Sequence, residues 1–337
     1  MLDISFLLLN MCFPVFAGLA MILDRKEYTE KKLARRALTI IVISVCFLVL
    51  NITGEEKRTL LFSIGSELPV YFHMDALGKM LAMVVSVVWT ATICFAGEYM
   101  KEEGDQKRFF GFFLVVYGVL MALCYAGNLV TFYLFYEMMT LLTVPLVLHT
   151  RTREAITAGI KYLLYSLCGA YLVLFGIYIL NHYTTSLNFA AGGTLDMASV
   201  SGHETLILIV ACLMILGFGV KAGMFPMHGW LATAHPAAPA PASAVLSGVI
   251  VKMGVLGVVR VVYEIIGADF IQGTWVQMMW LTLALITVFM GSMLAYRENL
   301  LKKRLAYSTV SQISYILFGL ALLQPEAMTG AMLHVVF

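Results

Sequence analysis

Two lysines and one glutamate stand alone inside long apolar stretches of the chain. Lys221 and Lys252 flank a segment that contains four prolines and two histidines, and Glu137 is the only charge between Asn128 and His149. Insertion scales put the cost of a lysine at the bilayer centre at about 2.5 to 3.5 kcal/mol. Charges in such positions therefore predict a functional site rather than a solvated surface.

The depth of these residues follows from their positions in the apolar stretches. Lys252 is about twelve residues into its stretch, or roughly 18 Å along a helix, which is near the middle of a hydrocarbon core about 30 Å thick. Glu137 is about nine residues in, or roughly 14 Å. Both are predicted to lie well below the lipid headgroups.

The composition is that of a polytopic membrane protein. Hydrophobic residues make up 61% of the 337 residues and charged residues 12%, whereas about a quarter charged is usual for a soluble domain. The lipid bilayer is therefore an expected partner, and nothing indicates nucleic acid binding. We expect an all-α fold, a transmembrane helical bundle.

Hydropathy predicts about ten complete spans and a truncated eleventh that begins near Ala327 and stops at Phe337. The polar segment before Tyr71 is expected to be an extended loop or a small hairpin. The predicted spans cover roughly residues 2–23, 37–52, 73–97, 109–126, 128–149, 156–180, 205–235, 240–264, 274–296 and 305–323.

The seventh span is predicted to be broken. Residues 205–235 would form about 46 Å of continuous helix, which is too long for one crossing, and Gly223 and Pro226 offer a place for a break. Non-helical backbone at membrane depth is tolerated only where protein or a water-filled cavity surrounds it. The break therefore predicts a hydrated pocket beside Lys221.

The basic residues predict that the amino terminus is outside. With this orientation the outward loops hold only Lys57 and Arg58. The inward segments hold fifteen basic residues: Arg25, Lys26, Lys31, Lys32, Arg35, Arg36, Lys101, Lys107, Arg108, Arg151, Arg153, Arg297, Lys302, Lys303 and Arg304. Lys79, Lys161 and Arg260 lie within about two turns of a predicted span boundary, where their side chains are expected to snorkel to the interface.

Three charges at membrane depth suggest a proton relay. Desolvation lowers the pKa of a buried amine and an opposite charge raises it, so a small displacement of a partner can switch its protonation. In this hypothesis Glu137 holds a proton on Lys221, which then passes it toward Lys252. Waters, the hydroxyls of Thr140, Tyr165 and Ser243 and the imidazoles of His228, His235 and His334 would complete the path, although packing at the break would equally explain His228 and His235.

Metal and cofactor sites are not expected. The six cysteines each stand alone in an apolar segment, with no CxxC and no histidine at ligand spacing. No nucleotide-binding fingerprint follows a strand. Any redox chemistry would belong to another chain.

Several ordered motifs resemble the antiporter-like membrane subunits shared by respiratory complex I, membrane-bound hydrogenases and Mrp-type Na⁺/H⁺ antiporters. The motifs are YFHMDALGKM, FYEMMTLLTVPL, IKYLLYSLCGA, VKAGMFPMHGW, SGVIVKMGVLGVVR and ENLLKKRLAYSTVSQISYILFG, and the last of them slightly favours the Mrp type. The resemblance implies two inverted five-helix repeats. It also implies that Glu137 and Lys221 form the ion pair of a first half-channel, that Lys252 is the central lysine, that Lys161 lines the route and that His334 is the histidine of span eleven.

The same resemblance implies an N-terminal part at 1–108, a first half-channel at 109–264 and the start of a second at 265–337, with the exit residue beyond Phe337. It implies a multi-pass subunit of the cell inner (plasma) membrane that works with other membrane subunits and moves H⁺, in one version in exchange for Na⁺. A redox-driven pump module and an Mrp-type antiporter subunit both remain open. So do a self-contained secondary solute transporter and a non-conducting scaffold subunit.

Overall fold

The computed structural model describes residues 6–25, 30–54, 58–65 and 68–337. Lys26 and Lys57, which enter the charge count above, lie outside these ranges. The chain divides into two compact units. The first unit comprises Met1–Gly159 with Ala237–Val249, and the second comprises Ile160–Pro236 with Ile250–Phe337.

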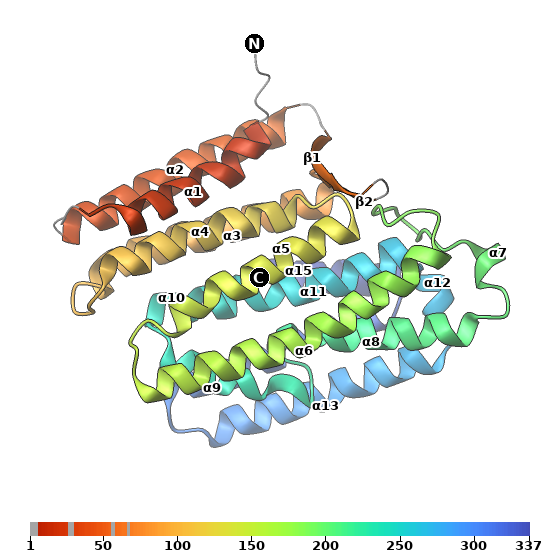
Figure 1. Ribbon diagram of the computed structural model, residues 1–337. Helices are drawn as coiled ribbons and strands as arrows, with labels where there is room; N and C mark the ends of the chain where they lie inside the picture. The colour runs from red at the N-terminus through yellow and green to blue at the C-terminus, as the bar shows by residue number, and fades with distance from the viewer. Residues whose placement is uncertain (1–5, 26–29, 55–57, 66–67) are drawn as a thin grey trace, which may run out of the picture. The chain divides into compact units, whose positions relative to one another are not determined.

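The first unit consists of helices and one hairpin (Figure 1). Its elements are α1 (Phe6–Leu23), α2 (Glu30–Thr53), β1 (Thr59–Ile64), β2 (Leu68–Phe72), α3 (Ala76–Tyr99), α4 (Gln106–Cys124), α5 (Leu129–Val147) and α10 (Ala240–Val245). The strands pair antiparallel, so of the two expected forms of this polar segment, an extended loop or a small hairpin, the structure has the hairpin. Asp75 then caps α3, because its carboxylate accepts the Gly78 N–H at 2.7 Å.

Helices α1 and α4 approach each other closely through glycines. A β-carbon on Gly118 would lie 2.4 Å from the Met11 carbonyl oxygen, and one on Gly18 would lie 2.5 Å from the Gly111 carbonyl oxygen. In lipid, helices associate mainly through such close van der Waals packing and through hydrogen bonds. These small residues therefore determine how near α1 can lie to α4.

A buried asparagine adds hydrogen bonds to the same part of the first unit. Asn10 on α1 donates to the Ser44 carbonyl of α2 at 2.5 Å, and the Tyr125 hydroxyl at the end of α4 donates to Asn10 Oδ1 at 2.8 Å. All three residues are buried. The asparagine thus links three helices in a region where an unsatisfied amide would be costly.

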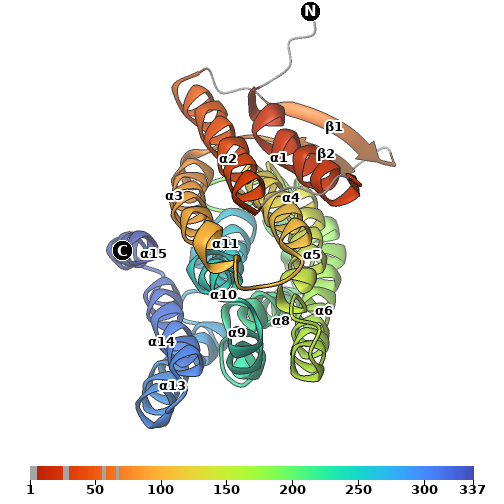
Figure 2. The ribbon, with the colours of Figure 1, turned by 90° about the vertical axis from the view of Figure 1, so that its left-hand side faces the viewer.

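The second unit is also helical. Its elements are α6 (Arg153–Tyr183, from residue 160), α7 (Met197–Val200), α8 (Glu204–Ala222), η1 (Met227–Trp230), α9 (Leu231–Ala237), α11 (Val251–Val259), η3 (Arg260–Ile266), α12 (Ala268–Ile271), α13 (Trp275–Arg297), α14 (Leu301–Ala321) and α15 (Pro325–Val336). Helices α13 and α14 pack side by side, and α15 packs on α14 (Figure 2).

Nine helical segments within the described residues are long and apolar enough to cross a membrane. They are Phe6–Leu23, Lys31–Thr53, Ala76–Tyr99, Gln106–Cys124, Leu129–Val147, Arg153–Tyr183, Glu204–Ala237, Ala240–Ile266 and Trp275–Arg297. The predicted tenth span corresponds to α14, which is not among these nine segments and carries three basic residues in its first turn. Its 21 residues extend about 31 Å, which is long enough to cross. The all-α transmembrane fold is confirmed.

The break in the seventh span is also confirmed. Helix α8 ends at Ala222, and Gly223 follows in the left-handed conformation, with φ of 76°. Its N–H donates to the Val220 carbonyl and that of Met224 to the Gly219 carbonyl, so the helix end is capped by its own backbone. Pro226 then precedes the 3₁₀ turn η1 and the short helix α9.

The eighth span contains two irregular turns that no sequence pattern predicted. Residues Leu246–Ile250 (η2) and Arg260–Ile266 (η3) wind as π-helix on either side of α11. Such turns are often found at functional sites. Lys252 lies two residues after the first of them, and Arg260 begins the second.

Adding a methyl group at Gly118 should destabilise the protein. Gly118→Ala places a β-carbon against the Met11 carbonyl, so we expect the free energy of unfolding to fall by about 1 to 3 kcal/mol, measured as a lower thermal midpoint. Gly330→Ala is the matched control, because nothing lies within 4 Å of a β-carbon at that helical glycine. If the thermal midpoint of Gly118→Ala is not lower than that of the wild type and of Gly330→Ala, the close contact between α1 and α4 is contradicted.

Candidate functional site

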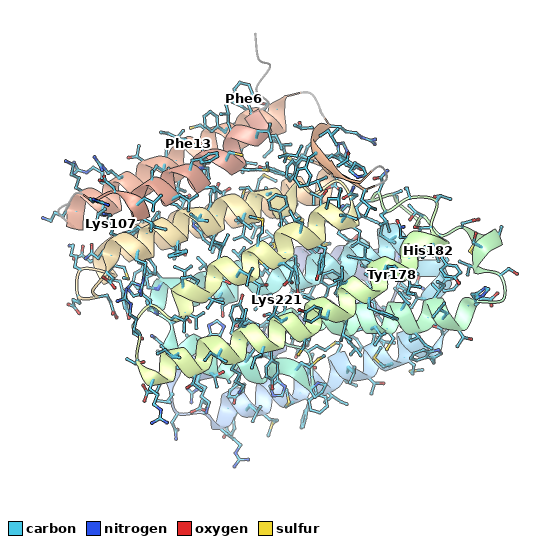
Figure 3. The ribbon with its side chains drawn as sticks, in the orientation of Figure 1. Phe6, Phe13, Lys107, Tyr178, His182 and Lys221 are labelled. Atoms are coloured by element: carbon cyan, nitrogen blue, oxygen red, sulfur yellow. The ribbon has the colours of Figure 1, made fainter. Side chains whose placement is uncertain are left out.

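Lys221 is the most deeply buried lysine among the described residues of the second unit. Its side chain is 1% exposed, and it lies in the last turn of α8, directly before the break (Figure 3). Nζ donates to the Tyr162 hydroxyl and to the Ser166 hydroxyl, both at 3.0 Å. Both acceptors come from α6, four residues apart, so they lie on one face of that helix.

Glycines bring the helices around Lys221 close together. Gly169 on α6 and Gly217 on α8 face each other, since a β-carbon on either would lie 2.6 Å from the carbonyl oxygen of the other. On α11, a β-carbon at Gly254 would lie 2.7 Å from the Phe218 carbonyl and 3.2 Å from the β-carbon of Lys221. Larger residues at Gly169 or Gly217 would separate α8 from the α6 hydroxyls that accept from the amine, and a larger residue at Gly254 would separate α11 from α8.

Aromatic rings form a wall of the same site. The ring of Tyr162 lies 4.5 Å from Lys221 Nζ and 4.9 Å from the ring of Trp230 on η1. The Trp230 indole N–H in turn donates to the Val220 carbonyl at 2.8 Å. Because α8 ends here, that carbonyl lacks its usual intrahelical partner, and Trp230 therefore stabilises the broken end.

His228 belongs to the 3₁₀ turn η1 that follows the break, and Lys161 of α6 lies beside that turn. A β-carbon on Gly229 would lie 3.5 Å from the Tyr165 hydroxyl and 3.7 Å from Lys161 Nζ. His228, the residue before Gly229, stacks on Phe225 with ring centroids 6.2 Å apart. Its Nδ1 is buried and has no hydrogen-bond partner among the described residues. The structure thus brings a second amine and an imidazole to the broken helix.

Lys252 contacts a different helix. Its half-buried amine donates to the Val335 carbonyl of α15 at 2.6 Å. The neighbouring residue, His334, is exposed, and its Nε2 lies 2.9 Å from Gln312 Oε1 on α14. Lys252 and the histidine of the eleventh span are therefore associated with one turn of α15.

Glu137 lies on α5 and is half-buried. It belongs to the first unit, whereas Lys221 belongs to the second. The ion pair between Glu137 and Lys221 therefore stays a prediction, as does the transfer from Lys221 to Lys252.

The sequence of this chain matches one known protein family over more than half of its length. The transmembrane family described as NADH:quinone oxidoreductase/Mrp antiporter matches residues 126–337, which is more than half of the chain. The chain belongs to this family. The matched residues include Glu137, Lys161, Lys221, Lys252 and the described helices that carry them.

Similar proteins include subunits named for hydrogenases and quinone oxidoreductases. Hydrogenase-4 component B of Escherichia coli is 32% identical over 264 residues, which are 78% of this chain and 38% of that protein. NADH-quinone oxidoreductase subunit N of Desulforudis audaxviator is 30% identical over 265 residues, 78% of this chain and 52% of that protein. The chain thus spans between a third and about half the length of these relatives.

A solved structure has the same fold. A chain in the Mrp complex from Dietzia sp. superposes with a TM-score of 0.82 at 22% identity, over 100% of this chain and 62% of that chain. This similarity supports the helical architecture described above.

Sequence reasoning missed the groups that hold Lys221. It proposed Thr140, Tyr165 and Ser243 as hydroxyls on the route, whereas the amine bonds to Tyr162 and Ser166. The four-residue spacing of these two could have indicated a polar face on the sixth span. The prediction that Arg260 snorkels is wrong, because its side chain is 1% exposed and pairs with Glu264 inside the protein.

Coupling between Lys221 and Tyr162 should be measurable in this family member. We expect Tyr162→Phe and Lys221→Met to show a coupling free energy of about 0.5 to 3 kcal/mol in a double-mutant cycle of thermal stability, because each removes one end of the same hydrogen bond. Tyr165→Phe is the matched control, since that hydroxyl lies beside Lys161. Additive effects of Tyr162→Phe and Lys221→Met would show that the bond contributes nothing.

Proposed function

We propose that this chain is a proton-translocating, antiporter-like subunit of a multisubunit membrane complex. The observation that carries the proposal is the amine of Lys221, buried at the broken end of a membrane helix and held by two hydroxyls. Ionisable residues inside a membrane commonly line ion pathways or proton relays. Membership of the antiporter family supports this use of the site.

In the proposed mechanism, the proton affinity of Lys221 is switched by a carboxylate. Glu137 holds a proton on Lys221 when it is near, and the proton moves toward Lys252 when Glu137 withdraws. Moving one charge against 100 mV requires about 2.3 kcal/mol. Two unit charges about 4 Å apart interact by a few kcal/mol at an intermediate dielectric, which is enough to control such a transfer.

The remaining predicted site residues take supporting roles in the proposal. His228 belongs to the turn that contains Gly229, and Lys161 lies beside that turn. There the two side chains would exchange protons with water entering at the break. Lys252 is bonded to the carbonyl next to His334, so His334 with Gln312 would receive the proton from Lys252. Each transfer would pass between groups that titrate, through hydroxyls and water.

The partners and setting are part of the same proposal. The similar proteins are components of hydrogenase, quinone oxidoreductase and Mrp complexes, so we infer other membrane subunits as partners of this chain. We also propose the bacterial plasma membrane with the amino terminus outside, a half-channel over residues 109–264 and the start of a second over 265–337. Exchange of H⁺ for Na⁺ is the variant proposed for an Mrp-type complex.

Removing either lysine should stop ion movement without preventing assembly. In the full-length protein within its complex, Lys221→Ala and Lys252→Ala are each expected to reduce driven proton transport in vesicles by at least about tenfold, because no other amine occupies the same position in the relay. Lys101→Ala is the matched control, since that lysine lies in the turn after α3 and pairs with Glu98. Unchanged transport in assembled variants would favour the scaffold, and uptake of a solute by the chain alone would favour the transporter.

Sodium dependence separates the two versions of the function. Vesicles that contain the complex should acidify or alkalinise in response to a sodium gradient if the subunit exchanges Na⁺ for H⁺, because the two fluxes are then obligatorily linked. Proton movement that is the same with and without sodium would indicate a pump module driven by another reaction. The Lys221→Ala complex serves as the baseline in both conditions.

A further inference from the structure

A permanent positive charge is buried in the eighth span, beyond Lys252. Arg260 is 1% exposed and lies at the start of η3. The guanidinium group stays protonated at every physiological pH, so Arg260 cannot carry a proton as the lysines can. The relay proposed above gives this charge no role.

The guanidinium group is held on two sides. Nη1 donates to Glu264 Oε2 at 2.6 Å, within an i, i+4 pair along η3. Its central carbon lies 4.5 Å from the ring centroid of Phe189, which belongs to the loop between α6 and α7. The Glu264 side chain is 18% exposed, so in this pair the cation is the deeper partner.

The loop that carries Phe189 is tied to the end of the same span. The Ala190 N–H donates to the Glu264 carbonyl at 3.2 Å and the Thr194 N–H to the Ile265 carbonyl at 2.8 Å. A β-carbon on Gly193 would lie 2.7 Å from the Gly267 nitrogen. The carbonyls of Glu264 and Ile265 lie in the last turn of the helix, where intrahelical donors are lacking, and the loop supplies donors to both. The ring of Phe189 in the same loop covers the guanidinium group of Arg260.

The position of Arg260 relative to Lys252 indicates what the buried charge can do. Eight residues separate them along one span, which is about 12 Å. Arg260 lies between Lys252 and the loop at residues 184–203, on the side that the basic residues predict to be outside. A proton or other cation leaving Lys252 toward that loop would have to pass a fixed positive charge. Fixed arginines exclude cations in this way in water-selective pores.

We propose that Arg260 is an electrostatic barrier that prevents protons at Lys252 from escaping along the eighth span to the loop side. The inference rests on the proposed function, because it assigns Arg260 the task of keeping the relay's proton on its lateral route. Glu264 orients the guanidinium and partly offsets its charge. Phe189 and residues 190–194 close the space above it.

A purely structural ion pair makes a different prediction from a barrier. If the pair only ties the π-helical turn, removing either partner breaks the same bond and has the same effect. If the positive charge itself excludes cations, removing Arg260 opens the route, whereas removing Glu264 leaves the positive charge uncompensated and does not. The opposite charges of the two partners therefore provide matched control variants.

The test measures passive proton leak in vesicles that contain the full-length protein in its complex. A potassium diffusion potential drives protons inward, and a trapped pH-sensitive dye records the flux. We expect Arg260→Gln to raise the leak roughly threefold to tenfold, in line with one unit charge about 12 Å away at an effective dielectric near 20. Glu264→Gln should not exceed the wild-type leak, and Arg260→Lys, which keeps the charge, should remain near it. The amount of assembled complex is measured for each variant.

A second background shows whether the leak passes through the relay. Combining Arg260→Gln with Lys252→Ala should return the leak to the wild-type level. The barrier is overturned if Arg260→Gln leaves the leak unchanged, if Glu264→Gln leaks as much as Arg260→Gln, or if the leak persists without Lys252. The proposed function is judged separately, from driven transport in Lys252→Ala: loss of that transport with no added leak in Arg260→Gln would overturn the barrier alone.

Discussion

The burial of an amine at the end of a membrane helix is the constraint on which the second unit depends. An ammonium group that is 1% exposed needs acceptors that replace water, because an unpaired charge in hydrocarbon is costly. Lys221 finds them in Tyr162 and Ser166 on the neighbouring helix. Hydroxyls hold the amine without fixing its charge, since a hydroxyl can accept from an ammonium or donate to a neutral amine. A site of this kind is suited to a residue whose protonation changes.

The backbone around Lys221 meets a second demand of the bilayer. Ending a helix at membrane depth leaves carbonyls without partners, and α8 resolves this through the left-handed Gly223 and through the Trp230 indole on the Val220 carbonyl. The close approach of α6 and α8 at Gly169 and Gly217 then brings the hydroxyls within reach. The break and the buried charge therefore support each other, because the same few residues stabilise both.

The second unit uses two kinds of positive charge. Lys221 and Lys252 are amines that can lose a proton, and both are bonded to neutral oxygen atoms. Arg260 cannot lose its charge and is bonded to a carboxylate. Titratable charges suit a transfer path and a fixed charge suits its boundary, so the choice of residue type at each place is consistent with directed proton movement.

The sequence by itself determined the spans and the break at Gly223 and Pro226, because each depends on local hydropathy or on a local backbone preference. It left the polar segment after the second span open between an extended loop and a hairpin, and strand pairing in the structure decided for the hairpin. The sequence also showed which charges stand alone at membrane depth. Only the tertiary structure decided what those charges contact: Tyr162 and Ser166 at Lys221, the Val335 carbonyl at Lys252, and the burial of Arg260 under the loop at Phe189. Membrane helices carry apolar residues on most of their faces, so hydropathy does not reveal which face meets which neighbour, and no sequence pattern indicates the π-helical turns on either side of α11.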